Sequence, residues 1–249
     1  ELMNASGDSE RASFLKIASC DINNEPLFEG IEEHAGLASD LPILFSTGTA
    51  SEAEVERALG WLAPARPRLI FECVSAYPAP AADYNLALLE RWRRRFECPV
   101  GLSDHTESNA LSLAAVALGA RAIERHFTLD RGMPGPDQAL SLDPADFRAL
   151  RDGMDAVFAA RGGGPRIASP SEDPPRIYGR RALYAARDLR AGAKLSREDL
   201  IAKRPGGADG AYAPTDAESL PGAAIIRDVA AGALITRQDL SADPGTESP

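Results

Sequence analysis

The sequence has few of the residues that would assign it to a specialised class of protein. Its three cysteines are an odd number without zinc-motif spacing, which argues against a disulfide framework and a cysteine-based zinc site. Positive charge is in deficit: the formal net charge of −10 makes nucleic acid and anionic lipid poor candidates for partners. The printed sequence has no apolar run of 18 residues and no signal peptide. We therefore expect a cytoplasmic protein that binds neither nucleic acid nor membrane.

The rest of the composition is that of a globular protein. Of the 249 residues, 44% are hydrophobic and 26% are charged, which suffices for one large domain or two unequal ones. The first residue is Glu1 and not Met, so we expect either processing or a longer gene product.

Five apolar runs alternate with helical patterns over the first 160 residues, which predicts a parallel α/β sheet. Each run ends in polar residues, as is typical of the (β/α)8 barrel, where functional side chains follow several strands. A closed barrel needs eight strands, so five indicate a partial barrel, and an open sheet is the structural alternative. The expected strands are residues 14–19, 42–48, 68–75, 99–105 and 120–127.

Two of the three histidines, His105 and His126, lie at the ends of the fourth and fifth runs. Alternate residues of a strand share a face, so Ser103 accompanies His105, and Glu124 accompanies His126. The pattern therefore predicts that four polar side chains converge at one end of the sheet.

The last third of the chain has a different pattern. A Gly/Pro/Ser-rich stretch at 161–176 predicts a linker. Beyond it, residues 187–200 recur as 227–240 with 8 of 14 positions identical, which indicates an internal repeat. Each copy is expected to form a strand, an Ala-Gly turn, a strand and a capped helical turn. We expect a partial barrel at 1–160, a small β-rich domain at 177–242, and a disordered tail at 243–249.

Eight motifs occur in the order seen in sialic acid synthases (N-acetylneuraminate synthases), and the chain resembles this family over residues 14–242. The resemblance extends to the synthases of other bacterial nonulosonic acids and of spore-coat polysaccharide. It implies a TIM barrel, here its last five β/α units, followed by an antifreeze-like (SAF, β-clip) domain. The motifs are LKIAS, DINN, STGT, CVSAYPAP, LSDHT, IERHFTLDR, GPDQALSL and AKRPGG.

The resemblance also implies an activity. Members condense phosphoenolpyruvate with N-acetylmannosamine or a similar amino sugar and release phosphate, using Mn²⁺ or another divalent metal (Mg²⁺ or Co²⁺), as domain-swapped homodimers. By motif, His105 and His126 resemble the metal ligands, and Asp21 and Glu124 the catalytic acid/base groups. The substrate-binding residues implied are Lys16, Ser19, Ser46, Ser75, Tyr77, Ser103, Asp137 and Arg204, the last reaching a partner's site.

Several of these residues also have a purely structural interpretation. Asp21 can cap the next helix, Asp137 can serve a turn, Tyr77 can pack and Arg204 can be a surface residue. The sequence departs from the family at Cys20 and Glu72, and it lacks counterparts of the first three strands. We therefore expect the chain alone to be inactive, and poorly soluble or oligomeric.

Two other functions stay open, and so does the acceptor sugar. The chain can be a non-catalytic paralogue that dimerises through its SAF domain, or a lyase or aldolase on a different barrel. The acceptor can lead to sialic, legionaminic or pseudaminic acid or to a spore-coat sugar; the KIASCDINN pattern slightly favours sialic or legionaminic acid.

Overall fold

The structure is a computed structural model that describes residues 13–34 and 40–241. The chain divides into two compact units, Glu1–Gly163 and Gly164–Pro249, which are treated separately below. The predicted disordered tail at 243–249 lies outside the described residues. Among the described helices, none has both the length and the apolar character that a membrane span requires.

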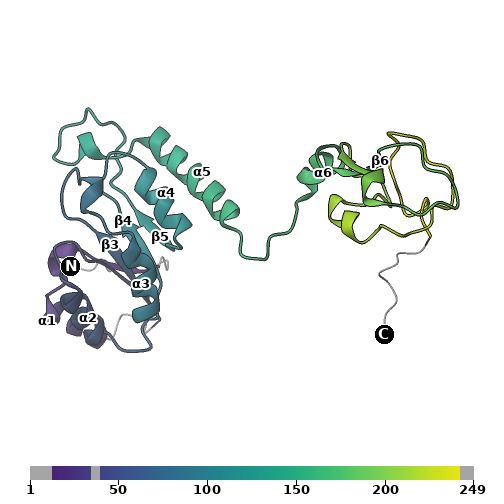
Figure 1. Cartoon of the computed structure of the whole chain (residues 1–249). Helices are drawn as coiled ribbons and strands as arrows, with labels where there is room; N and C mark the ends of the chain where they lie inside the picture. Colours follow the sequence, from purple (N-terminus) through teal and green to yellow (C-terminus); the bar gives the residue numbers. More distant parts are fainter. Residues whose placement is uncertain (1–12, 35–39, 242–249) are drawn as a thin grey trace, which may run out of the picture. The chain divides into compact units, whose positions relative to one another are not determined.

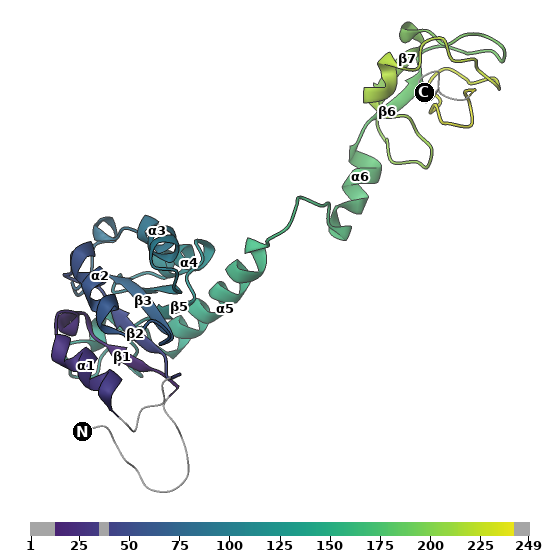
Figure 2. The ribbon, with the colours of Figure 1, turned by 90° about the horizontal axis from the view of Figure 1, so that it is seen from below.

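The first unit contains a five-stranded parallel sheet in the sequential order β1-β2-β3-β4-β5. This order confirms the predicted β/α succession. Figure 1 labels β3, β4 and β5, and Figure 2 adds β1 and β2. The strands are β1 (Leu15–Ile17), β2 (Ile43–Ser46), β3 (Arg68–Cys73), β4 (Val100–Ser103) and β5 (Ala122–Glu124), and the helices are α1 (Glu25–Glu33), α2 (Glu52–Trp61), α3 (Ala87–Arg95), α4 (Ala110–Ala117) and α5 (Pro144–Arg161). Short 3₁₀ turns lie at Ser19–Asp21, Ala81–Asp83 and Gln138–Leu140.

The two faces of this sheet have different surroundings. Ile43, Phe45 and Ile70 are fully buried and pack with residues of α1, α2 and α3 in one apolar core. Figure 2 shows these helices beside the sheet. The alternate strand residues point to the other face; among them Lys16 and Glu124 are partly buried, whereas Ser46 and Ser103 are fully buried. Polar side chains are thus collected on the face that the core helices do not cover.

The strands are shorter than the sequence predicted. The β4–β5 ladder ends at the pair Ser103–Glu124, so His105 and His126 lie two residues beyond their strands. Thr106 and Thr128, which follow the predicted strands, are nevertheless buried in the loops. The backbone ladder alone therefore does not fix the two histidines.

Helix α2 begins with a capping box. Ser51 accepts a hydrogen bond from the Glu54 amide, and the Glu54 carboxylate accepts one from the Ser51 amide at 2.8 Å. Ser51→Ala removes the hydroxyl that accepts from the Glu54 amide and donates to the Glu54 carboxylate, so we expect the free energy of unfolding to fall by about 1 kcal/mol. Denaturant unfolding measures the loss; Ser51→Thr is the control because it retains the hydroxyl, and an equal loss in both variants would contradict the capping role.

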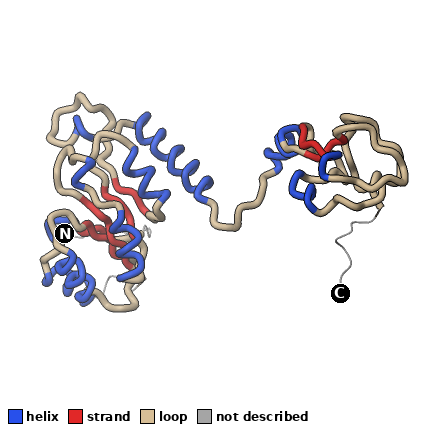
Figure 3. The backbone as a smooth tube through the Cα atoms, viewed as in Figure 1, coloured by secondary structure: helices blue, strands red, loops and turns tan. Residues whose placement is uncertain are grey.

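The second unit consists mostly of loops around a two-stranded antiparallel sheet of β6 (Ala182–Ala185) and β7 (Leu200–Lys203) (Figure 3). Helix α6 (Asp173–Gly179) begins inside the predicted linker of residues 161–176, so part of that stretch is helical. The remaining 3₁₀ turns lie at Pro170–Glu172, Arg197–Asp199 and Pro214–Glu218.

The two copies of the repeat pair with each other. Leu189 and Val229, at equivalent positions, exchange two backbone hydrogen bonds of 2.8 and 2.9 Å. Asp188 accepts from the Ala231 amide, and its counterpart Asp228 accepts from the Ala191 amide, each at 2.8 Å. The strands predicted within each copy are reduced to isolated bridges, and β7 begins only at Leu200, the last residue of the first copy.

Candidate functional site

A cavity of about 320 Å³ lies at the carboxyl ends of the five parallel strands. Nine of the twelve residues singled out from the sequence line it, together with Ala18, Cys20 and Cys73. The nine are Lys16, Ser19, Ser46, Ser75, Tyr77, Ser103, His105, Glu124 and His126. The structure therefore brings residues from all five β/α units to one place, as is expected when functional side chains follow the carboxyl ends of several barrel strands.

Charge in the cavity is concentrated in one ion pair. Lys16 Nζ lies 3.3 Å from Glu124 Oε2, and both side chains stay partly exposed. Ser103 Oγ donates to Glu124 Oε1 at 2.7 Å, which leaves the second carboxylate oxygen to Lys16. Lys16 also lies over the ring of Phe71, 5.6 Å from its centroid. One cation and one hydrogen-bonded carboxylate are thus held at β1 and β5 within reach of a ligand.

The rings of His105, His126 and Tyr77 form a cluster. The two imidazole centroids lie 5.2 Å apart, and the Tyr77 ring lies 4.3 Å from His105 and 5.4 Å from His126. His105 Nδ1 lies 2.7 Å from the Val74 carbonyl oxygen, which can only accept, so Nδ1 carries the proton. Burial lowers the pKa of His105 and favours the neutral ring, and its Nε2 then offers a lone pair.

Two serines in the cavity differ in their hydrogen bonding. Ser46 is 2% exposed, and its Oγ has no hydrogen-bond partner among the described residues. A buried hydroxyl is ordinarily paired, so an unpaired one that lines a cavity indicates a missing ligand or water. Ser19 Oγ accepts from the Gly48 amide at 3.0 Å.

Gly48 provides a sharp test of this cavity. A Cβ at position 48 would lie 2.1 Å from Ser75 Oγ and 2.9 Å from Ser19 Oγ, so both hydroxyls must move. Gly48→Ala is expected to weaken at least about tenfold any binding of phosphoenolpyruvate, the ligand that the family resemblance implies, while the fold is retained. Isothermal calorimetry measures the affinity. Gly60→Ala is the matched control, because nothing lies within 4 Å of its added Cβ; equal affinities in both variants would contradict the assigned cavity.

Three predicted residues do not line the cavity. Asp21 lies in the 3₁₀ turn after β1 and does not cap α1, where Asn24 is the N-cap residue. Asp137 is exposed, with its Oδ2 3.7 Å from His126 Nδ1. Arg204 belongs to the second unit, where its Nε donates to the Gly179 carbonyl at 2.5 Å.

The fit of a metal ion rests on the two imidazoles. Neutral His105 presents Nε2, and the adjacent His126 comes from the next strand end, which suits a divalent transition metal. Within residues 13–34 and 40–241, no cluster of three His, Cys, Asp or Glu side chains is arranged to hold a metal. The residues present thus supply two nitrogen ligands, and the remaining positions would be left to water or substrate.

Sequence reasoning did not identify the residues that lie outside the cavity and hold its lining segments in place. Tyr84 accepts a hydrogen bond from the His105 amide at 2.8 Å and donates to the Ser103 carbonyl at 3.2 Å. Asp104 and Arg125, between the residues that face the cavity, form a buried ion pair of 2.7 Å. The available signal was strand parity: a charged residue that alternates with cavity residues must point into the protein.

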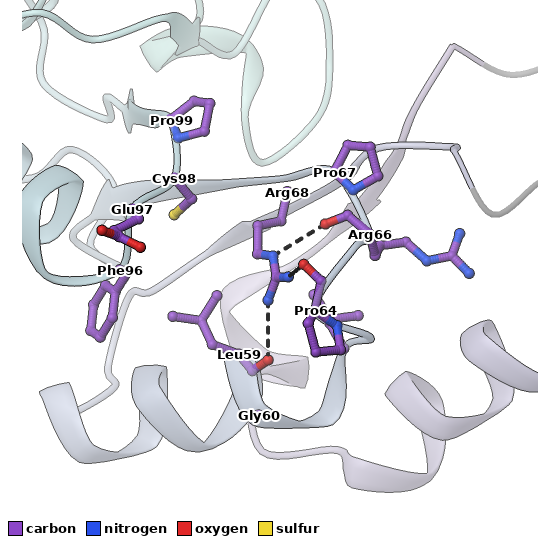
Figure 4. A pocket seen from close by; sticks show the side chains of 11 residues that line it. Leu59, Gly60, Pro64, Arg66, Pro67, Arg68, Phe96, Glu97, Cys98 and Pro99 are labelled. Atoms are coloured by element: carbon purple, nitrogen blue, oxygen red, sulfur yellow. Dashed lines mark hydrogen bonds between the residues drawn. The ribbon is translucent and has the colours of Figure 1, made fainter.

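A second, larger cavity of about 510 Å³ lies at the opposite, amino-terminal ends of β3 and β4 (Figure 4). The Arg68 guanidinium donates hydrogen bonds to the backbone carbonyls of Leu59, Ala63, Pro64 and Arg66, so it stabilises the loop between α2 and β3. This cavity contains no histidine, and the converging polar groups lie at the other end.

The first unit, a sequential parallel β/α unit with a polar cavity at the carboxyl ends of its strands, has the architecture of a partial (β/α)8 barrel. The second unit is a small β domain built from an internal repeat. The family model of the NeuB family matches residues 8–166, and that of the SAF domain matches residues 180–241. The chain belongs to the NeuB family.

The chain is also similar in sequence to individual proteins that are named as nonulosonic acid synthases. The chain is 33% identical over 234 residues to N,N'-diacetyllegionaminic acid synthase of Legionella pneumophila, covering 92% of this chain and 64% of that protein. It is 31% identical over 215 residues to N-acetylneuraminate-9-phosphate synthase of Mus musculus, covering 86% and 58%.

A solved structure is similar as well. The crystal structure of N-acetylneuraminic acid synthetase from Leptospira borgpetersenii, in complex with citrate, has a TM-score of 0.58 and 35% identity, covering 65% of this chain and 55% of that one. The chain thus spans somewhat more than half the length of these relatives.

Proposed function

We propose that this chain forms part of a nonulosonic acid synthase site, where phosphoenolpyruvate condenses with an amino-sugar aldehyde and phosphate is released. The observation that carries the proposal is the single cavity that combines Lys16, two histidines and an unpartnered buried Ser46 hydroxyl. Relatives named as synthases of legionaminic and N-acetylneuraminic acids support the substrate class.

The anionic substrate would lie at the β1–β3 side of the cavity. Lys16 supplies a point charge for a phosphate or carboxylate, and Ser46 supplies a donor that has no other partner among the described residues. Ser19 and Ser75 add hydroxyls on either side of Gly48. Together these groups offer an anion several donors in a chain that is acidic overall.

His105 and His126 would hold a divalent metal ion, which supplies a Lewis acid for the aldehyde oxygen of the amino sugar. Glu124 stands beside them, and its two oxygens are occupied by Ser103 and Lys16. A carboxylate held in this way can take or return a proton at the reacting centre. Tyr77, whose ring lies beside both histidines, and Asp137, whose Oδ2 lies 3.7 Å from His126 Nδ1, would meet the sugar.

Binding is the first step to test, because the chain spans only part of the length of its relatives. Calorimetric titration of the chain with phosphoenolpyruvate is expected to show binding, and Lys16→Met is expected to weaken it about 10- to 100-fold through loss of a charged hydrogen bond. The matched control is Lys194→Met, which changes an exposed lysine of the second unit. Binding that is absent, or equal in all three proteins, would contradict the proposal.

We also propose that the synthase works as a homodimer in which Arg204 serves a partner's site. Arg204 is exposed in its own unit and is held only by the Gly179 carbonyl among the contacts described. Light scattering coupled to gel filtration tests the dimer; a strictly monomeric chain would remove this part of the proposal while leaving the binding test unaffected.

A further inference from the structure

The buried ion pair of Asp104 and Arg125 lies directly behind the two histidines. Along the end of β4, Ser103 and His105 line the cavity, and Asp104 between them points the opposite way. Along the end of β5, Glu124 and His126 line the cavity, and Arg125 between them does the same. The two charged side chains are 0% and 2% exposed, and their closest atoms lie 2.7 Å apart.

The hydrogen bonds of Asp104 are saturated. Its Oδ1 accepts from the amide and the hydroxyl of Thr106 at 2.9 and 2.8 Å. Its Oδ2 accepts from Ser112 Oγ at 2.6 Å and from Arg125. A carboxylate with four donors is held in one orientation, and through Ser112 that orientation is tied to helix α4.

Arg125 continues the connection into the loop after β4. Its Nη2 donates to the Thr106 carbonyl at 2.7 Å, and its Nη1 donates to the Ser108 carbonyl at 3.2 Å. One side chain from the end of β5 therefore contacts three residues that follow β4. The planar guanidinium can do this because its donors diverge in fixed directions.

These contacts occur beyond the point where backbone hydrogen bonds of the sheet join β4 to β5. The ladder ends at Ser103–Glu124, and the last link between the two strands is the Asp104 amide, which donates to the Glu124 carbonyl at 3.0 Å. Beyond that point the backbones of His105 and His126 bond to other segments, at Ala79 and Leu142. Among the described contacts, only the Asp104–Arg125 pair and its loop bonds join the two histidine-bearing segments through side chains behind the cavity.

We propose that Asp104 and Arg125 are positioning residues that set the separation of the His105 and His126 rings and thereby the affinity of this pair for a divalent metal. A buried ion pair often adds little to stability compared with an apolar pair of similar volume, so its retention fits a role in specifying geometry. The metal-affinity part rests on the proposed function; the ring-separation part does not.

The test uses the full chain with ¹⁵N-labelled histidine. Wild-type protein is expected to show nuclear Overhauser contacts between the ring protons of His105 and His126. The double variant Asp104→Leu/Arg125→Met replaces both charged side chains by apolar ones of similar volume. It is expected to melt cooperatively and to lose these contacts. It is also expected to bind Mn²⁺ alone about 10- to 100-fold more weakly, as measured by electron paramagnetic resonance.

The matched control is Glu32→Leu/Arg66→Met. This pair is also largely buried, at 2.9 Å, but it lies before β3, at the opposite end of the strands from the cavity. The control is expected to keep the ring contacts and the Mn²⁺ affinity, whatever its melting temperature. If the Asp104/Arg125 double variant does not fold, Arg125→Lys replaces it, and partial loss of the ring contacts is expected because one ammonium group cannot reach all three acceptors.

Two results would overturn the proposal: a folded Asp104/Arg125 variant that retains the ring contacts, or a control that loses them equally. Failure of the proposed function is a separate outcome. A wild-type chain that shows the ring contacts but binds no Mn²⁺ would remove the metal from the proposed function and would support the positioning role on the ring contacts alone.

Discussion

Replacing Asp104 alone by leucine is expected to lower the free energy of unfolding by about 3–5 kcal/mol. The reason is the charge that remains: the Arg125 side chain is 2% exposed and would lose its only carboxylate partner among the described contacts. Breaking one half of a buried pair leaves an uncompensated ion in a medium of low polarity. Urea unfolding of the full chain, followed by circular dichroism, measures the loss.

The control for this prediction is an exposed pair. Asp155→Leu breaks the contact between Arg151 and Asp155 on α5, where both side chains are more than 60% exposed, and is expected to change stability by less than about 1 kcal/mol. The double variant Asp104→Leu/Arg125→Met is expected to regain most of the single variant's loss. A single variant as stable as wild type would show that Arg125 finds another partner.

Raising the pH from 5 to 8 is expected to destabilise the first unit through Glu72. This carboxyl is 4% exposed, and one of its oxygens has no hydrogen-bond partner among the described residues. Burial, and to a lesser degree the charge of Asp104, raises the pKa of Glu72 to about 7, although the Asn85 amide opposes the shift. Since the folded state holds this proton more tightly than the unfolded chain, unfolding releases it between pH 4.5 and 7.

The free energy of unfolding therefore falls as the pH rises through that window, by up to about 3 kcal/mol for this group. Glu72→Gln keeps the size of the side chain and cannot ionise, so its stability should fall less between pH 5 and 8. Urea unfolding of both proteins at the two pH values gives the difference, which cancels other titrating groups. Identical pH dependence in the two proteins would assign Glu72 an ordinary pKa.

The sequence predicted the order and direction of the elements because hydrophobic runs and helical periodicity are local signals. Ser51 with Glu54, and Asp143 before Pro144, marked two helix starts that the structure confirms. The strand ends were placed too late: the ladder stops at Ser103 and Glu124, and the backbones of His105 and His126 bond to other segments instead of to each other. Boundaries thus depended on tertiary packing.

For the site, strand parity correctly placed Ser103 with His105 and Glu124 with His126. It did not find Tyr84, which reaches β4 from a loop 19 residues earlier. It also could not identify the unpartnered Ser46 hydroxyl, because an orphaned atom becomes visible only when all neighbours are placed. Contacts between segments that are distant in the chain could therefore not be predicted from this single sequence.

The reciprocal contacts within the second unit make its two repeat copies structurally dependent on each other. Asp188 and Asp228 each complete the turn of the other copy, so neither 14-residue copy contains its own partner. The contacts have the reciprocal form of an isologous interface, in which one copy gives to the other what it receives. This reciprocity makes the two halves a single cooperative unit: a chain cut between the copies would expose the unpaired edges of both at once.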